Sequence, residues 1–192
     1  MKLRLITILA FILIVPHIAC GQSTYGIKSH EILFEGTSNI QSWTAEVKEM
    51  AGSFTLLVEN GKINQLVDAN VNIDAGSIEG SEGRRMDSKI YEALDIKNHP
   101  QISFLLREVN SLTENPGTFK LETRGVLTVA GVSRNIPMIV YGKVMQNGDL
   151  EFSGSQKILM SDHRISPPTA LLGALKTGDE IMLSYKVVLN KK

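Results

Sequence analysis

The sequence predicts an all-β fold, an antiparallel barrel of about eight strands with one short helical insert at about residues 86–96. Apolar and polar residues alternate with a period of two along most of the chain, as in half-buried strands. Asn-Gly pairs at 60–61 and 147–148 mark tight turns between such runs. Only residues 77–104 break the alternation, with a helical segment flanked by charges. A sheet with one apolar face must cover that face and its edges, and closing on itself achieves both.

The N-terminal segment, residues 1–19 or 1–21, has the layout of a secretory signal peptide. Two cations, Lys2 and Arg4, precede an apolar run that ends at Val15, and small residues follow. The run is shorter than the roughly 20 apolar residues that span a bilayer. We therefore expect residues 22–192 to form a single domain that is periplasmic or secreted.

Cys20 is the only cysteine of the chain and lies between Ala19 and Gly21. Small neighbours at this place resemble the lipid-attachment site of bacterial lipoproteins, where the thiol is acylated and becomes the N-terminus. His17 departs from that motif, which usually has leucine three residues before the cysteine. Cleavage after Gly21 fits the small-residue rule equally well. The sequence leaves both forms open, a membrane-anchored lipoprotein and a soluble protein.

The charge of the chain excludes a nucleic-acid partner. Lys plus Arg and Asp plus Glu number 20 each, and removal of Lys2 and Arg4 with the signal leaves the mature chain slightly negative. Its basic groupings are pairs, such as those at 84–85 and 191–192. Binding to phosphate backbones requires larger clusters of cations.

The clearest strand covers residues 67–74, where Val67, Ala69, Val71 and Ile73 share one face and four polar residues share the other. The same period continues in the remaining predicted strands, at residues 54–58, 102–106, 119–129, 138–144, 150–160 and 181–189.

The insert contains a short helix that Ser88 caps. Ile90, Tyr91 and Leu94 lie three and four residues apart, so they form one apolar stripe that would cover a barrel opening. The step at 99–100, His-Pro, ends the helix because proline disfavours helical backbone in the residue before it.

An ordered set of residues resembles the YceI-like family of bacterial envelope proteins, in the branch typical of Bacteroidetes. These residues are Ser77, Ile78, Asp87, His99, Pro100, Ile102, Phe104, Gly125, Leu127, Thr128, Gly131 and Val132. The resemblance implies an exported, lipocalin-like barrel that holds a polyisoprenoid, an isoprenoid quinone or a similar long-chain amphiphilic lipid, and it implies no catalysis. Arg164 replaces a glycine usual in the family, and the His-Asp pair usual before Trp43 is absent.

The inward residues of the strands would line such a ligand site, since an apolar ligand requires a lining with few polar groups. The candidates are Trp43, Phe54, Val71, Ile73, Leu94, Phe104, Leu106, Leu121, Leu127, Met138, Val140, Phe152 and Met160. Alternation alone favours an interior that these side chains simply fill, which would make the protein a solid envelope domain that binds protein partners. The resemblance to the YceI-like family favours an interior that holds a lipid.

Three cations are candidates for the head group of a bound lipid, namely Arg84, Arg85 and Arg164, because guanidinium groups pair well with phosphate. For the pair at 84–85 beside Asp87, the alternative is a solvated loop with local ion pairing.

Catalysis and metal binding find little support. Ser161, Asp162 and His163 are consecutive, and neighbours on a strand point to opposite faces, so they form no catalytic triad unaided. His30, His99 and His163 have no metal-ligand spacing. We expect no cofactor and no enzymatic activity, and the sequence leaves open whether two barrels pair as a homodimer.

Overall fold

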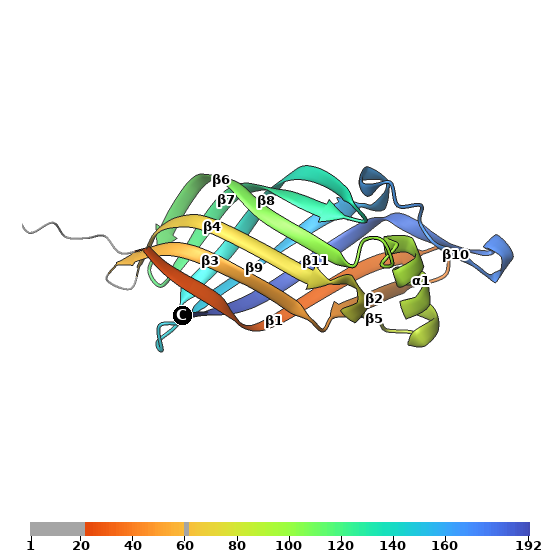
Figure 1. Ribbon diagram of the computed structural model, residues 1–192, viewed down its shortest axis with the longest axis horizontal. Helices are drawn as coiled ribbons and strands as arrows, with labels where there is room; N and C mark the ends of the chain where they lie inside the picture. Colours follow the sequence, from red (N-terminus) through yellow and green to blue (C-terminus); the bar gives the residue numbers. More distant parts are fainter. Residues whose placement is uncertain (1–21, 60–61) are drawn as a thin grey trace, which may run out of the picture.

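The computed structural model describes residues 22–59 and 62–192. The described residues form a closed antiparallel barrel of eight strands (Figure 1), which confirms the predicted fold class. Around the barrel the order is β11-β9-β8-β7-β6-β4-β3-β1, and β1 pairs with β11 to close it. The eight strands are β1 (Gln22–Ser38), β3 (Met50–Glu59), β4 (Lys62–Asp74), β6 (Gln101–Asn115), β7 (Thr118–Val129), β8 (Val132–Val144), β9 (Leu150–Leu159) and β11 (Leu175–Lys191).

The smaller elements gather at one end of the barrel, which we call the helix end (Figure 1). The opposite end, which carries the β6–β7 and β8–β9 turns, is called the turn end. The elements of the helix end are β2 (Ser42–Val47), β5 (Ile78–Gly80), β10 (Thr169–Ala170), α1 (Arg84–Leu94) and the 3-10 turns η1 (Ala75–Ser77), η2 (Met160–His163) and η3 (Leu171–Gly173). The apolar residues of α1 pack beside β5 rather than across the inside of the barrel.

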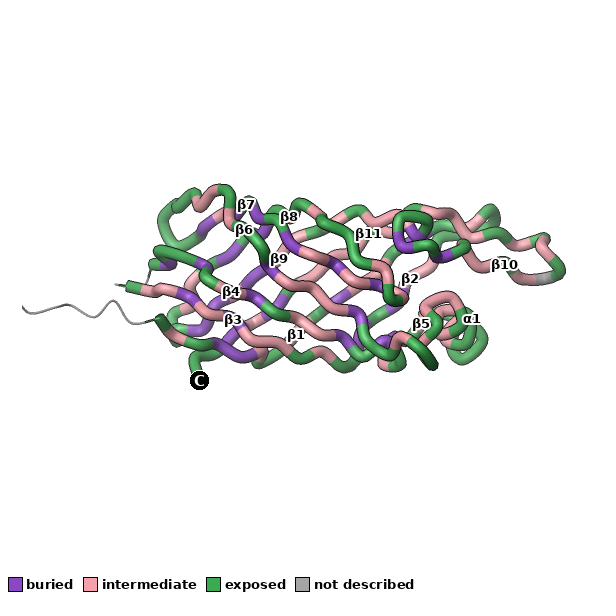
Figure 2. The backbone as a smooth tube through the Cα atoms, turned by 45° about the horizontal axis from the view of Figure 1, so that its top comes forward, coloured by how far each residue is buried: buried purple, intermediate pink, exposed green. Residues whose placement is uncertain are grey.

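Side chains fill the interior at the turn end. The ring of Phe152 meets Phe119 edge-on, with centroids 5.5 Å apart, and meets Phe54 in the same way at 6.0 Å. Leu121 and Leu189 beside them have no solvent-exposed surface. Buried and more exposed residues alternate along the strands (Figure 2), and the inward positions predicted for residues 119–129 are all buried. This half of the barrel is a packed core.

The prediction for residues 67–74 is wrong at its first position. A β-bulge shifts the register between β3 and β4, so that Thr55 lies opposite Asp68 while Leu56 lies opposite Leu66. Val67 is the extra residue of the bulge and is 39% exposed, whereas Leu66 takes the inward position. A bulge exchanges the inward and outward positions of the residues that follow it, and the alternation of residue types does not reveal where this happens.

The helix spans residues 84–94 instead of about 86–96, and Ser88 is not its cap. Gly83 occupies the N-cap position, and the Ser88 hydroxyl inside the helix donates to the carbonyl oxygen of Arg84 at 2.9 Å. The Asp87 carboxylate accepts a 2.7 Å hydrogen bond from the Gly80 amide, which ties the first turn to β5. A tertiary contact thus moves the start of the helix by one half-turn.

The predicted turn at residues 147–148 is confirmed, with Gly148 at φ 84°. The turn at residues 60–61 and the predicted signal at 1–21 lie outside the described residues. Within the described ranges, every helix is too short or too polar to cross a bilayer.

Candidate functional site

Several inward side chains toward the helix end keep solvent-accessible surface, although others there, such as Leu127 and Val129, are buried. In a closed barrel, an inward side chain keeps solvent-accessible surface only where its neighbours leave space. Val71 and Phe104 are cross-strand partners that face inward and are half-buried, and so is Met138 on β8. Leu183 on β11 and its partner Phe34 on β1 are half-buried as well. Partly accessible apolar side chains on the inner face therefore come from β1, β4, β6, β8 and β11.

The structure divides the thirteen candidate lining residues into two groups. Five remain half-buried, namely Trp43, Val71, Leu94, Phe104 and Met138. Eight are buried in the core, namely Phe54, Ile73, Leu106, Leu121, Leu127, Val140, Phe152 and Met160. Trp43 lies at the helix end, where its ring covers Gly36 and its indole N–H donates to the Thr37 carbonyl at 3.3 Å. A role in ligand binding stays a prediction for all thirteen.

Several inward residues around the accessible space were not among the candidates. Ile181, Leu183 and Tyr185 lie on one face of β11, and their alternation was readable in the predicted strand at residues 181–189. Phe34 belongs to β1, whose register with β11 shifts between Ile27 and Ser29. That shift weakens the period-two signal of β1, so the pattern did not reveal the strand.

Tyr185 brings a polar group into this apolar interior. Burial raises the pKa of its phenol well above the ordinary value, so the hydroxyl is neutral and can donate. The Tyr185 side chain crosses Gly154 of β9, and its hydroxyl donates to the carbonyl oxygen of Ile139 on β8 at 3.4 Å. A side chain at residue 154 would collide with the Tyr185 ring.

The Tyr185 hydrogen bond lies on a seam in the barrel wall. Among the described residues, β8 and β9 pair only between 141–144 and 150–153, and the rest of β8 has no strand beside it on this edge. Pro137 fits this edge because it has no N–H to leave unpaired. At the helix end the Nδ1–H of buried His163 donates to the Val132 carbonyl at 2.9 Å. Side chains, rather than a strand ladder, hold the seam closed there.

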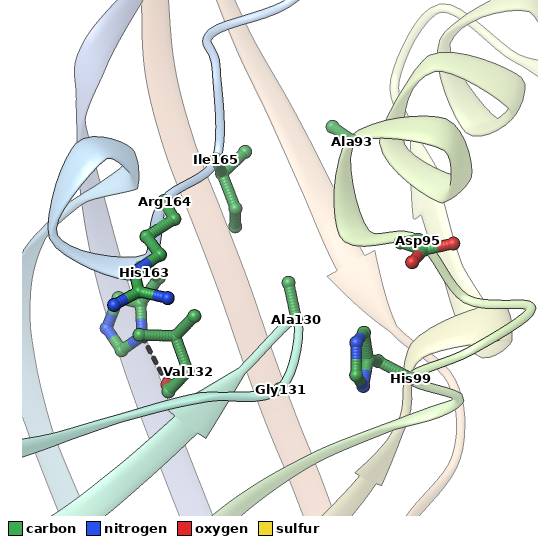
Figure 3. A pocket seen from close by; sticks show the side chains of 9 residues that line it. All are labelled: Ala93, Asp95, His99, Ala130, Gly131, Val132, His163, Arg164 and Ile165. Atoms are coloured by element: carbon green, nitrogen blue, oxygen red, sulfur yellow. Dashed lines mark hydrogen bonds between the residues drawn. The ribbon is translucent and has the colours of Figure 1, made fainter.

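A pocket of about 410 Å³ opens at the helix end, between the end of α1, the β7–β8 turn and η2 (Figure 3). Its lining is Ala93, Asp95, His99, Ala130, Gly131, Val132, His163, Arg164 and Ile165. Three non-glycine lining residues have left-handed backbone, Asp95 at φ 49°, Ala130 at φ 47° and Arg164 at φ 58°. Such conformations are costly outside glycine and cluster at functional sites. We call this cavity the helix-end pocket.

The three predicted head-group cations do not come together. Arg164 lines the helix-end pocket, but Arg84 and Arg85 are exposed on the first turn of α1 and are not part of its lining. His99 and Asp95 line the side of the pocket opposite Arg164 (Figure 3). Asp95 already accepts two hydrogen bonds from the Asn98 amide, at 2.9 and 3.0 Å.

The triplet at residues 161–163 was predicted to lie on a strand, but it lies in the 3-10 turn η2. The Ser161 hydroxyl donates to Asp179 at 2.5 Å, while the His163 ring is bonded to Val132. Serine and histidine therefore have separate partners. No three metal-ligating side chains cluster within the part of the chain that the structure describes.

The fold and site define the class of protein as a closed antiparallel barrel with a partly accessible apolar interior and a polar pocket at one end. The chain belongs to the YceI-like family, because the model of the YceI-like domain matches residues 25–189. No curated protein matches the chain.

Solved structures with the same fold include proteins from Burkholderia cenocepacia, Saccharophagus degradans and Campylobacter jejuni. Burkholderia cenocepacia BcnA is 20% identical, with a TM-score of 0.63 and coverage of 83% of this chain and 95% of that chain. A polyisoprenoid-binding domain from Saccharophagus degradans, implicated in plant cell wall breakdown, is 10% identical, with a TM-score of 0.69 and coverage of 88% and 98%. The Campylobacter jejuni YCEI protein is 19% identical, with a TM-score of 0.58 and coverage of 77% and 84%. At these identities the likeness shows the fold alone.

Proposed function

We propose that this protein binds a polyisoprenoid or a similar long-chain amphiphilic lipid, with the tail inside the helix-end half of the barrel. The observation that carries the proposal is the set of inward apolar side chains that stay half-buried, among them Val71, Phe104, Met138 and Leu183. Covering such surface with an apolar tail is favourable by about 25 cal/mol for each Å² removed from water. The polyisoprenoid-binding domain from Saccharophagus degradans, which has the same fold, supports the choice of ligand class.

The polar head of the lipid would lie in the helix-end pocket, beside Arg164. This guanidinium forms no ion pair with another described residue, and a left-handed backbone holds it at the pocket where glycine would be less strained. Arg84 and Arg85 stay candidates for a more distant contact with the head. A charge-assisted bond from Arg164 would favour a phosphate or another anionic head over a neutral one.

Native mass spectrometry of the protein purified from its cell envelope without detergent tests the proposal. A complex that releases an isoprenoid mass on solvent extraction is the expected result. Protein that is bare, and still bare after incubation with isoprenoid alcohols and phosphates, would contradict the proposal and favour a solid envelope domain that binds protein partners.

Replacement of Arg164 by glycine is expected to weaken binding of an isoprenoid phosphate about tenfold, because a charge-assisted hydrogen bond is lost. Binding of the matching isoprenoid alcohol should not change. The melting temperature should not fall, since glycine suits φ 58° better than arginine does. Fluorescence titration with the two lipids measures the effect, and Arg124→Ala is the matched control, since Arg124 is exposed on β7 away from the pocket. Equal losses for both lipids would rule out a head-group role for Arg164.

We propose that the protein acts as a binder without catalysis and without a cofactor. The separate partners of Ser161 and His163 support this, since a serine nucleophile needs its base within hydrogen-bond reach. A second copy of the chain is not needed to complete the interior, because the pairing of β1 with β11 already closes the barrel.

We further propose that the chain is exported, either acylated at Cys20 or cleaved after Gly21. Gln22 begins β1 at the turn end, and two residues span at most about 7 Å, so a lipid on Cys20 would hold the turn end at the membrane. The helix-end pocket would then face away from that membrane. An acylated protein should carry a fatty-acyl mass on its N-terminal residue that Cys20→Ser lacks. If the mature protein begins at Gln22 in N-terminal mass analysis, acylation is excluded.

A further inference from the structure

The β10–β11 hairpin projects beyond the barrel at the helix end (Figure 1). Its base is a short ladder in which Thr169 pairs with Lys176 and Ala170 pairs with Leu175. The six residues from Ala170 to Leu175, ALLGAL, contain no polar side chain. Leu172 near the tip is fully exposed and has left-handed backbone at φ 55°. Consecutive apolar residues at an exposed tip are avoided in soluble proteins unless they serve a function.

A second loop is fastened to this hairpin. The Asn39 amide group donates to the Ala174 carbonyl at 2.9 Å and accepts from the Lys176 N–H at 2.8 Å. The backbone N–H of Asn39 also donates to the Lys176 carbonyl at 3.0 Å. The next residue, Ile40, is 62% exposed, in a turn that the Ser38 hydroxyl fixes by accepting from the backbone N–H of Ile40. Exposure of Ile40 therefore follows from an ordered turn.

We propose that Ile40 and Leu172, which we call the apolar tip, insert into the interface of a lipid bilayer. The tip consists of single side chains on two projecting loops, whereas a specific protein interface buries about 800 Å² on each partner. A bilayer interface accepts such isolated apolar side chains without a complementary surface. Exposed Lys176, within the hairpin ladder, adds attraction to anionic lipids.

Two acidic side chains beside these loops accept hydrogen bonds from their neighbours. Glu82 accepts one from the Gln41 amide, and Asp179 accepts one from Ser161. The tip and the helix-end pocket lie at the same end of the barrel, so docking of the non-acylated form through the tip would place the pocket next to the membrane (Figure 1).

Co-sedimentation with vesicles of phosphatidylethanolamine and phosphatidylglycerol tests the inference, with the full chain in a Cys20→Ser background so that no acyl group contributes. Leu172→Asn and Ile40→Ser should each lower the partition coefficient about tenfold, because each removes one apolar side chain from the bilayer. Ile139→Ser is the matched control, since Ile139 is 44% exposed but lies on the barrel wall. It should leave the partition coefficient unchanged.

Leu172→Asn also separates membrane binding from a structural role. Asparagine tolerates left-handed backbone better than leucine does, so the melting temperature should stay the same or rise while vesicle binding falls. Wild-type protein that stays in the supernatant, or an Ile139→Ser loss as large as that of Ile40→Ser, would overturn the inference. So would self-association through the tip in sedimentation velocity runs. The inference does not depend on a ligand, because a variant with a blocked interior should still sediment with vesicles.

Discussion

Replacement of Met138 by tryptophan is expected to lower the affinity for a long-chain isoprenoid at least tenfold, an effect of about 1.4 kcal/mol or more. Met138 on β8 faces the interior of the barrel and is half-buried. Its cross-strand partner on β7 is the buried Thr123. A larger ring at this position would occupy the accessible space that the lipid tail needs. Because Met138 keeps solvent-accessible surface, the protein should accept the ring with little change in its free energy of unfolding.

Ile139→Trp provides the matched control for this experiment. Residue 139 is the next residue on the same strand, but its side chain points outward and is 44% exposed. Lipid titration should give wild-type affinity for Ile139→Trp, and urea unfolding should give similar midpoints for all three proteins. If Met138→Trp unfolds at much lower urea while Ile139→Trp does not, the interior is packed at Met138 and the proposed tail site is wrong.

Replacement of Gly142 by valine should destabilise the barrel by about 3 kcal/mol, from overpacking and from the loss of an aromatic contact. Gly142 on β8 lies directly between two cross-strand partners, Phe119 on β7 and Phe152 on β9. The two rings meet edge-on above it, with centroids 5.5 Å apart. A Cβ atom at residue 142 would overlap the Phe119 ring, so glycine is required for this contact.

A double-mutant cycle in urea unfolding measures this effect. Phe119→Leu alone should destabilise the protein by loss of ring contacts, but it should recover part of the stability when combined with Gly142→Val. Gly142→Ala should lie between wild type and Gly142→Val. Purely additive losses would show that the valine acts through the backbone and not through Phe119.

The sequence predicted the strand-rich fold and the place of the single helix, because both depend on local periodicity. The inward positions of residues 119–129 followed directly from alternation, and each of them is buried. Errors arose where a distant contact changed a local pattern. The bulge at Val67 depends on how β4 pairs with β3, and the start of α1 depends on the bond between Asp87 and Gly80.

The candidate site was predicted less well than the fold. Inward direction was readable for most lining residues, but their division into packed and accessible groups was not, since Leu121 and Met138 have equivalent positions in the pattern. Arg164 was found by its departure from a family pattern. Asp95 and His99 of the same pocket come from another part of the chain, and no local signal connects them with it.

The sequence by itself determined an all-β fold with an apolar inner face, because side-chain period and turn residues act over a few positions. Only the tertiary structure decided where the interior is filled, which edge of β8 lacks a strand, and which polar groups meet at the helix end. Those properties depend on the closure of β1 on β11, on the register of each strand pair and on the summed volume of side chains from eight strands. None of these quantities is encoded in a short stretch of residues.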